Sequence, residues 1–459
     1  MTPPLNGNFI GLRALWAWVF SHPSLTLLGI GALARLPCLG WPAEVVFDEV
    51  HWGRFFSGYF THQYYFDIHP PLGKLLYAGW AALFGFTADF VFESGVAYPA
   101  SWSLIFRGLP FLAGSILPLV VFGLAKAAGL RFGPSFMAGL LIALDSGLIN
   151  ISRFMLLDPF LLLFGFAALW RYECWRKDRI FAELLMAGAL AGLAVSIKWT
   201  GLSFLGLIVL REWLLPREPG AEAQGTHAAF MGIGALIIVP ISLYVLPFWI
   251  HFALLTDSGP GDAFMSAAFQ AGLRGNVYAL GDPLQGLGFL DRFLELNRVM
   301  YRASADLHAT HPYSSKWYTW PFMVRPVCLW YQSQEARIYL FGNPLIWWGS
   351  TAFLLTALQW LLRPSTRRLL SPLVYLFLGG WAMNFLPFIG IGRLMFLYHY
   401  LPALVFAVLL TAALMDRLEN PNPWVIVAVL GALVVGVYYS PVVYGVSVPW
   451  TPLWRTLWV

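Results

Sequence analysis

Two neighbouring carboxylates, Asp48 and Glu49, follow the first long apolar segment of the chain. Asp67, His69 and Lys74 come soon after them, in the run Asp-Ile-His-Pro-Pro-Leu-Gly-Lys. Only 11% of the residues are Asp, Glu, Lys or Arg, so a cluster of ionisable groups beside an apolar segment marks a candidate site. A carboxylate held there can take a proton from a hydroxyl as a general base. The pattern therefore predicts acid–base chemistry in this loop.

Basic and polar residues recur at the ends of later apolar segments. Cations held there suit a phosphate group, and a phosphate at a membrane edge suits a lipid carrier. We therefore expect one polar chamber at the outer ends of the helices, in which the arginines and Lys198 hold the phosphate. The further residues expected in this chamber are Arg107, Arg153, Asp158, Lys198, Arg393, His399 and Tyr400.

Several of these residues also have a plainer interpretation. Arg107 can extend to the membrane interface without binding a ligand. Arg153 and Asp158 are spaced for an ion pair about one turn apart, so a purely stabilising role for Asp158 stays open. His69 can cap a turn before Pro70-Pro71. Without the run that follows them, Asp48 and Glu49 would be interpreted as a solvated loop end.

The composition indicates that the elements carrying these groups lie in a membrane. Hydrophobic residues make up 59% of the 459 residues and aromatic residues 17%. A protein in water could not bury that much apolar surface. The net charge of +5 is small for this length and is scattered over short loops, which argues against a nucleic-acid partner. We expect an all-α, multi-pass membrane protein.

About eleven segments have the length that a bilayer core requires. The first reads as an uncleaved membrane helix, because it is too long for the apolar core of a signal peptide. The expected spans are 15–39, 102–125, 132–149, 155–172, 181–197, 200–215, 229–250, 339–362, 370–387, 394–415 and 424–442.

The basic residues of the short loops predict the orientation. Arg171 to Arg179 and Arg363 to Arg368 fall on one side if the N-terminus lies there too, and the positive-inside rule makes that side cytoplasmic. The long loops 40–101 and 251–338 then face outward, and their aromatic residues predict interfacial helices. We expect one membrane domain over 1–459, with 1–250 as the catalytic part and 339–459 as a C-terminal four-helix region.

The three cysteines predict no metal site. Cys38, Cys174 and Cys328 lack metal-ligand spacing. Cys38 and Cys328 fall near the same side of the membrane, so a disulfide between them stays open, although three packing cysteines are the favoured interpretation. No protein-built metal site and no organic cofactor is expected, whereas a divalent cation such as Mg²⁺ or Mn²⁺ stays open.

Several motifs resemble the protein O-mannosyltransferase family. Phe47-Asp48-Glu49-Val50-His51 and the later His-Pro-Pro-Leu-Gly-Lys run resemble the first outer loop of that family. Further matches follow in order along the chain. They are Ser152 to Asp158, Ser196 to Leu202, His311 to Trp317, Trp320-Pro321, Gly342-Asn343-Pro344 with Trp347-Trp348, and Tyr398 to Pro402.

The resemblance implies a fold, a reaction and roles for the residues. The fold is the GT-C type of membrane glycosyltransferase, and the reaction is inverting transfer of mannose from a polyprenyl-phosphate-mannose lipid to Ser or Thr hydroxyls of secreted or membrane proteins at the outer face. Asp48 takes the place of the family's first acid and is the expected base, and Glu49 is a second catalytic-site carboxylate. Glu49 and Asp67 would position the acceptor or orient neighbours.

The resemblance also bears on the location. Eukaryotic members carry a lumenal β-trefoil domain between the seventh and eighth spans, and the loop 251–338 shows no threefold repeat. The chain therefore resembles a bacterial-type member in the plasma membrane rather than one in the endoplasmic reticulum, with the secretion machinery as a further candidate partner.

Two other functions stay open. A related lipid-phosphate-sugar transferase would glycosylate a lipid or another polymer with the same fold. A transporter or lipid flippase would place ionisable groups near the midplane on broken helices. Here they are expected at the outer ends of the spans, which favours the enzyme.

Overall fold

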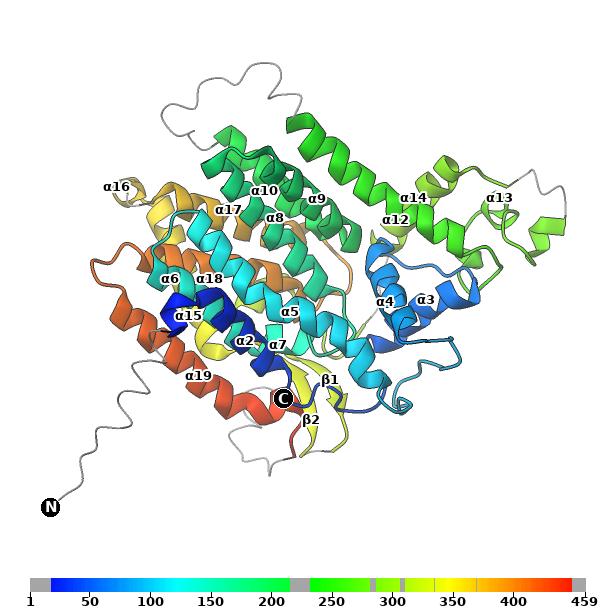
Figure 1. Cartoon of the computed structure of the whole chain (residues 1–459), viewed down its shortest axis with the longest axis horizontal. Helices are drawn as coiled ribbons and strands as arrows, with labels where there is room; N and C mark the ends of the chain where they lie inside the picture. Colours follow the sequence, from blue (N-terminus) through cyan, green and yellow to red (C-terminus); the bar gives the residue numbers. More distant parts are fainter. Residues whose placement is uncertain are drawn as a thin grey trace.

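The computed structural model describes residues 18–214, 232–280, 286–305, 310–333, 335–368 and 370–447. Nearly all regular structure in these ranges is helical (Figure 1). Within the described residues, six helical segments are long and apolar enough to cross a membrane. They are Trp102–Ala127, Gly234–Leu254, Pro344–Leu362, Pro372–Gly390, Leu397–Met415 and Asn422–Tyr444.

These segments confirm the expected integral membrane protein, whereas the number of eleven spans stays a prediction. Two expected spans begin at residues 15–17 and 229–231, which lie outside the described residues. The helices that precede the second outer loop and lie outside the first are, apart from those above, shorter or carry more charge. They are α2 (Pro23–Arg35), α6 (Phe132–Leu144), α7 (Ser146–Ile151), α8 (Asp158–Asp178), α9 (Phe181–Ile197) and α10 (Leu202–Leu214).

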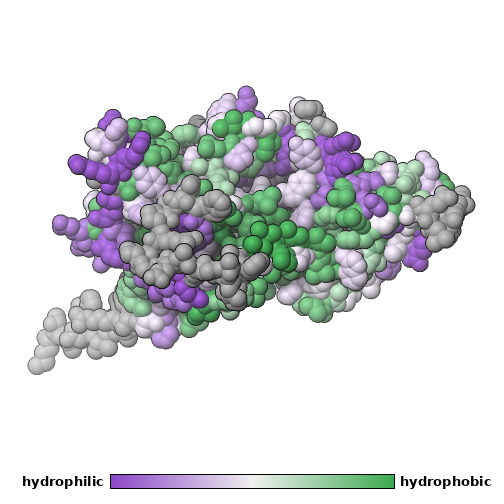
Figure 2. Space-filling view, turned by 90° about the horizontal axis from the view of Figure 1, so that it is seen from above, coloured by the Kyte–Doolittle hydropathy of each residue, from purple (hydrophilic) through white to green (hydrophobic). Residues whose placement is uncertain are grey.

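Helix α18 (Leu401–Met415) forms the centre of the bundle. Nearly all of its side chains are buried, and α6, α15 (Pro344–Leu362) and α17 (Pro372–Phe385) pack around it. Helix α19 (Asn422–Tyr444) lies at the periphery and exposes apolar residues such as Val427, Leu430 and Val434. Such an apolar surface suits contact with lipid. Figure 2 shows broad hydrophobic surface over the molecule, with hydrophilic residues gathered mainly at its left end.

A buried carboxylate interrupts one expected span. The segment 132–149 divides at Asp145, where α6 ends and α7 begins. The Asp145 side chain accepts hydrogen bonds from the backbone N–H of Leu148 and from Trp347 Nε1, at 3.0 and 2.8 Å. Asp145 therefore caps α7 and ties it to α15, because a helix start needs an acceptor for its free N–H groups.

The two long loops, called outer loops after their expected orientation, both contain helices, as predicted. The first contains α3 (Glu49–Thr61) and α4 (Leu72–Leu83), which pack on each other. The second contains η3 (Asp262–Phe264), α13 (Ala267–Gln270), η4 (Val277–Leu280), α14 (Phe289–Ala305) and η6 (Trp317–Phe322). The second loop also forms an antiparallel hairpin of β1 (Val327–Tyr331) and β2 (Arg337–Leu340), which corrects the purely helical expectation.

The two outer loops lie against each other through their backbones. Gln63 forms a bridge with Asp257, and the Gly261 N–H donates to the Tyr64 carbonyl at 3.1 Å. A Cβ at Gly261 would lie 2.4 Å from the Phe66 nitrogen, so only glycine permits this approach. This contact holds the second loop against the segment that leads to His69.

The end of the bundle far from these loops holds an ion-pair network. Glu173 contacts Arg211 at 3.2 Å and Arg176 at 3.6 Å, and Arg171 contacts Glu183 at 3.1 Å. These pairs join the last two turns of α8 to α9 and α10. Asp158 begins α8 at the other end, so the basic loop and the outer-loop helices lie at opposite ends of one helix about 30 Å long.

Candidate functional site

A cavity of about 730 Å³ opens among α3, α8, α10, α14 and α17. We call it the chamber. It is one connected space that brings together residues from both halves of the chain. Its ionisable and hydroxyl-bearing residues include Asp48, His69, Asp158, Lys198, Arg393, Tyr398 and His399.

Asp48 is the residue just before α3, and its carboxyl group lines the chamber. Its backbone carbonyl starts the helix by accepting from the Trp52 N–H at 3.1 Å. No other described residue donates a hydrogen bond to its carboxylate. Burial raises the pKa of Asp48 to about 7, against the opposing effect of the Lys198 ammonium. A carboxylate with that pKa is suited to accept a proton near neutral pH.

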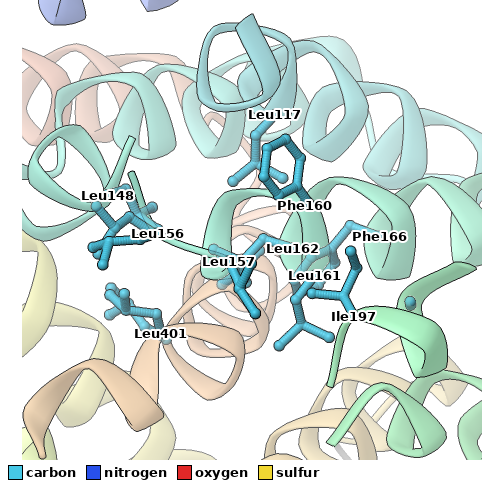
Figure 3. Close-up of a cluster of buried hydrophobic side chains, with 14 of the residues drawn as sticks. Leu117, Leu148, Leu156, Leu157, Phe160, Leu161, Leu162, Phe166, Ile197 and Leu401 are labelled. Carbon is cyan, nitrogen blue, oxygen red and sulfur yellow. The ribbon is translucent and has the colours of Figure 1, made fainter. Parts of the chain in front are cut away.

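Asp158 and Lys198 form an ion pair on the chamber wall. The Lys198 ammonium donates to both carboxylate oxygens of Asp158, at 2.8 and 2.9 Å. This pairing corrects the expectation that Asp158 pairs with Arg153. Asp158 is held in place by the apolar residues around it, because Leu156, Leu157, Leu161 and Leu162 pack in the buried cluster of Figure 3.

A glycine of the first outer loop packs on this cluster. A Cβ at Gly73 would lie 2.4 Å from a methyl carbon of Leu157. The Gly-Lys pair of the predicted motif therefore permits α4 to lie directly on the residues before Asp158. The two motifs are adjacent in space because of this contact.

Arg393 lies between η7 (Leu386–Gly390) and η8 (Leu397–Tyr400). Its Nη1 donates to Ser304 Oγ of α14 at 2.8 Å. Within the described ranges it contacts no carboxylate, and burial lowers its pKa from the ordinary arginine value. Arginine stays charged even so. Arg393 is therefore the chamber cation with capacity left to bind an anion.

Two histidines line the chamber on different walls. The His69 ring lies 5.8 Å from the Trp52 ring, and burial lowers the His69 pKa well below its ordinary value. His69 is therefore neutral at pH 7, with one donor and one acceptor nitrogen. His399 Nδ1 accepts from the Phe396 N–H at 3.2 Å, and its ring stacks on Trp320.

Glu49 points away from the chamber and forms a buried ion pair with Arg107. Arg107 Nε and Nη2 donate to the two oxygens of Glu49, each at 2.8 Å. Arg107 also donates to the Pro42 and Glu44 carbonyls, at 2.7 and 3.1 Å. This corrects the placement expected for both residues, because their polar groups are bound to each other and to the backbone.

Asp67 and Lys74 also lie outside the chamber lining. Lys74 Nζ donates to Asp67 Oδ2 at 2.5 Å and to the His69 and Pro70 carbonyls at 2.6 and 3.0 Å. The carboxylate, the ammonium and the turn of Pro70-Pro71 thus form one unit. Its effect is to hold the His69 backbone so that the imidazole reaches the chamber.

Arg153 and Tyr400 lie outside the chamber as well, which corrects their expected placement. Arg153 Nη1 and Nη2 donate to the Val443 and Cys38 carbonyls, at 2.8 and 2.7 Å. The Tyr400 hydroxyl accepts from Trp381 Nε1 at 3.3 Å and is fully buried. Both side chains join segments of the bundle.

The structure also shows how the three cysteines and the potential metal ligands are arranged. Cys38, Cys174 and Cys328 are free thiols, so Cys38 and Cys328 do not pair in this structure. Across the part of the chain that the structure describes, no three His, Cys, Asp or Glu side chains gather as a metal site. The chamber carboxylates do not fit such a site, since Lys198 occupies both oxygens of Asp158.

Several chamber residues were missed in the sequence. Trp52, Ser304 and Tyr398 line the chamber, although no prediction named them as site residues. Trp52 lies one helical turn after Asp48, so its spacing was a usable signal. No such signal in the sequence indicated Ser304, because α14 is far from the other motifs along the chain.

The fold and the chamber define the class of protein: a helical integral membrane protein with a polar chamber at one end of its bundle. Residues 25–256 match the family described as dolichyl-phosphate-mannose-protein mannosyltransferase, and residues 289–459 match the C-terminal four-span region of protein O-mannosyltransferase. The chain belongs to the protein O-mannosyltransferase family.

Curated relatives agree with this membership. Dolichyl-phosphate-mannose–protein mannosyltransferase 1 of Saccharomyces cerevisiae is 35% identical over 257 residues, which cover 53% of this chain and 32% of the relative. Protein O-mannosyl-transferase 1 of Mus musculus is 34% identical over 283 residues, covering 57% and 37%. The chain thus matches about a third of the length of these relatives.

Solved structures show the same fold. The S. cerevisiae protein O-mannosyltransferase Pmt1-Pmt2 complex, solved with the sugar donor bound, matches with a TM-score of 0.84 at 22% identity, covering 95% of this chain and 92% of that chain. An Archaeoglobus fulgidus oligosaccharyltransferase matches with a TM-score of 0.51 at 13% identity, covering 95% and 58%. The arrangement of helices is therefore the GT-C type that the motifs implied.

Proposed function

We propose that the protein is an inverting glycosyltransferase that transfers mannose from a polyprenyl-phosphate-mannose lipid to Ser or Thr hydroxyls of proteins. Membership of the family and the names of the relatives support the sugar, the lipid phosphate and the protein acceptor. The observation that carries the proposal is the chamber itself. It holds Asp48, a carboxyl group that accepts no hydrogen bond from the described chain, together with Arg393, a cation that contacts no carboxylate there.

These groups suffice for a direct displacement. The acceptor hydroxyl oxygen forms a bond to the anomeric carbon as Asp48 takes its proton. The bond between that carbon and the phosphate oxygen breaks, and its electron pair stays on the phosphate. Arg393, with the Lys198–Asp158 pair beside it, stabilises the added negative charge, so the leaving group needs no proton. A single displacement inverts the anomeric centre.

The other predicted site residues take supporting roles in this proposal. The Glu49–Arg107 pair fixes the start of α3 and therefore Asp48. Asp67 and Lys74 hold the segment that presents His69 to the chamber. His69 and His399 are neutral hydrogen-bonding groups for the sugar or the acceptor hydroxyl.

We also propose that the chamber faces the outside of the membrane. Arg176 and Lys177 lie in the last turn of α8, and Asp158 lies at its first residue. The positive-inside rule places the basic end in the cytoplasm, and the length of α8 spans a bilayer core. The link from α12 (Val239–Leu254) to α15 carries helices and a hairpin in its described parts, which supports a bacterial-type enzyme of the plasma membrane.

The test is a transfer assay with purified protein. Labelled polyprenyl-phosphate-mannose is incubated with a Ser/Thr-containing peptide, and the product is examined for an inverted anomeric configuration. We expect mannosylated peptide, with none formed when Ser and Thr are replaced by Ala. Label that appears only in lipid or polymer would assign another acceptor, and donor that crosses vesicles without transfer would indicate a transporter.

A further inference from the structure

Tyr398 is a chamber residue to which no role has been given so far. It lies in η8, directly before His399, and its side chain lines the chamber. No hydrogen bond joins its hydroxyl to another residue in the described ranges. The tyrosine two positions later, Tyr400, is buried and bonded to Trp381. The two tyrosines of one short segment therefore face different surroundings.

The ring of Tyr398 is firmly held. It stacks on Phe396 and His399, with centroid distances of 5.5 and 4.7 Å, and meets Phe47 edge-on at 6.3 Å. Phe47 is the residue before Asp48, so this contact joins the wall that carries the base to the wall that carries Tyr398. A ring packed against three other rings gives its hydroxyl a fixed direction at little entropic cost.

The charges around this hydroxyl are those of the proposed reaction. Lys198 Nζ lies 5.8 Å from the centre of the Tyr398 ring. Asp48, Asp158 and Arg393 all lie close enough to act on the hydroxyl electrostatically. Tyr398 thus shares the chamber with the carboxyl group that takes the proton and with the cations that hold the phosphate.

We propose that the Tyr398 hydroxyl donates a hydrogen bond to the phosphate oxygen that leaves the sugar. The proposal rests on the function proposed above and adds a group that acts on the leaving oxygen. A phenol is protonated at neutral pH and keeps its proton during the step. As the bond between carbon and oxygen breaks, the electron pair settles on that oxygen, and a fixed neutral donor stabilises it without needing reorganisation.

The experiment compares Tyr398→Phe with the wild-type enzyme in single-turnover transfer from polyprenyl-phosphate-mannose to a Ser/Thr peptide. We expect the rate to fall about a hundredfold, the usual loss for one donor to a developing charge. The dissociation constant of the donor should change less than about threefold, because the bond strengthens only in the transition state. The melting temperature should not change, since the substitution leaves no protein acceptor unpaired.

Tyr400→Phe is the matched control. It removes a hydroxyl from the same segment but outside the chamber, so it should lower the melting temperature and leave the rate of transfer unchanged. 3-Fluorotyrosine at position 398 retains the O–H group and should restore most of the rate. Loss of rate in the fluorotyrosine protein, which keeps the donor, would count against donation by the hydroxyl.

The pH profile separates this role from an action through Asp48. If the Tyr398 hydroxyl supported the Asp48 carboxylate, its removal would raise the Asp48 pKa and move the acidic limb of the profile to higher pH. We expect the limb to stay in place. A shifted limb or an unchanged rate would overturn the proposal. Absence of transfer by the wild-type enzyme would instead overturn the proposed function.

Discussion

Glu49 and Arg107 form a bidentate ion pair that is almost completely buried, with both nitrogen–oxygen distances at 2.8 Å. Glu49 also accepts from the Met155 and Val46 N–H groups, at 3.1 and 3.2 Å. One carboxylate therefore joins the start of α3, the helix α5 (Trp102–Ala127) and the segment that leads to Asp158. The ion pair therefore holds the chamber residues Asp48 and Asp158 in fixed positions relative to each other.

Arg107→Leu tests whether this pair supports the structure rather than the phosphate. The substitution leaves the buried Glu49 carboxylate unpaired, which costs about 3–5 kcal/mol. We expect a large fall in the melting temperature of the detergent-solubilised protein, with donor affinity retained in the folded fraction. A stable variant whose donor affinity is lost would instead assign Arg107 to the phosphate.

Arg393→Leu should instead weaken donor binding and leave the stability of the protein nearly unchanged. Arg393 lies in the chamber and contacts no carboxylate in the described structure. Its loss should remove the charge-assisted contact proposed for the donor phosphate, worth roughly 1.5–3 kcal/mol. Donor affinity should weaken about tenfold or more, with little change in melting temperature. Arg153→Leu serves as the comparison and should affect melting temperature alone. Equal donor affinities in the wild type and Arg393→Leu would place the phosphate elsewhere.

The pKa of Asp48 predicts how stability depends on pH. Burial raises the folded-state pKa to about 7, above the value of about 3.9 in an unfolded chain. Between these two values the folded protein binds more protons, so stability falls as pH rises from about 4 to about 7. Asp48→Asn removes this cost. We expect its melting temperature to exceed that of the wild type at pH 8, with the difference disappearing at pH 4.

A melting difference that does not depend on pH would contradict the raised pKa. Glu44→Gln is a suitable control, because Glu44 lies outside the chamber and bonds to Trp330 Nε1. It should show no increase in melting temperature at pH 8.

Most of the helical organisation was predictable because a bilayer imposes a simple rule on length and polarity. The apolar segments near 102–125, 339–362 and 424–442 correspond to long apolar helices. The break at Asp145 was not predictable, since the carboxylate acts through Trp347, which is distant in sequence. The hairpin of β1 and β2 was missed because its strands are short and lie in a loop rich in aromatic residues.

The sequence also could not predict which charged side chains of the site pair with each other. Local spacing favours Arg153 with Asp158, whereas the structure joins Asp158 to Lys198 and Glu49 to Arg107. These partners meet only once the helices have packed. The sequence therefore indicated which residues gather at one end of the bundle, but it could not separate those that face the chamber from those that support it.

Cysteine labelling tests the orientation of the chamber. Gln63 is exposed in the first outer loop and Lys177 is exposed at the opposite end of the bundle. In a background without the three native cysteines, a cysteine at 63 should react with an impermeant thiol reagent in intact cells. A cysteine at 177 should react only after the membrane is opened. The reverse pattern would place the chamber in the cytoplasm.

The central claim is that Asp48 is the base. Asp48→Asn keeps the size of the side chain and removes its ability to take a proton, so single-turnover transfer of mannose should fall by roughly a hundredfold or more. Donor affinity should be nearly unchanged, because Arg393 and the Asp158–Lys198 pair remain. The measurement is the rate of peptide mannosylation with enzyme in excess over labelled polyprenyl-phosphate-mannose. Transfer by Asp48→Asn at close to the wild-type rate would contradict the account.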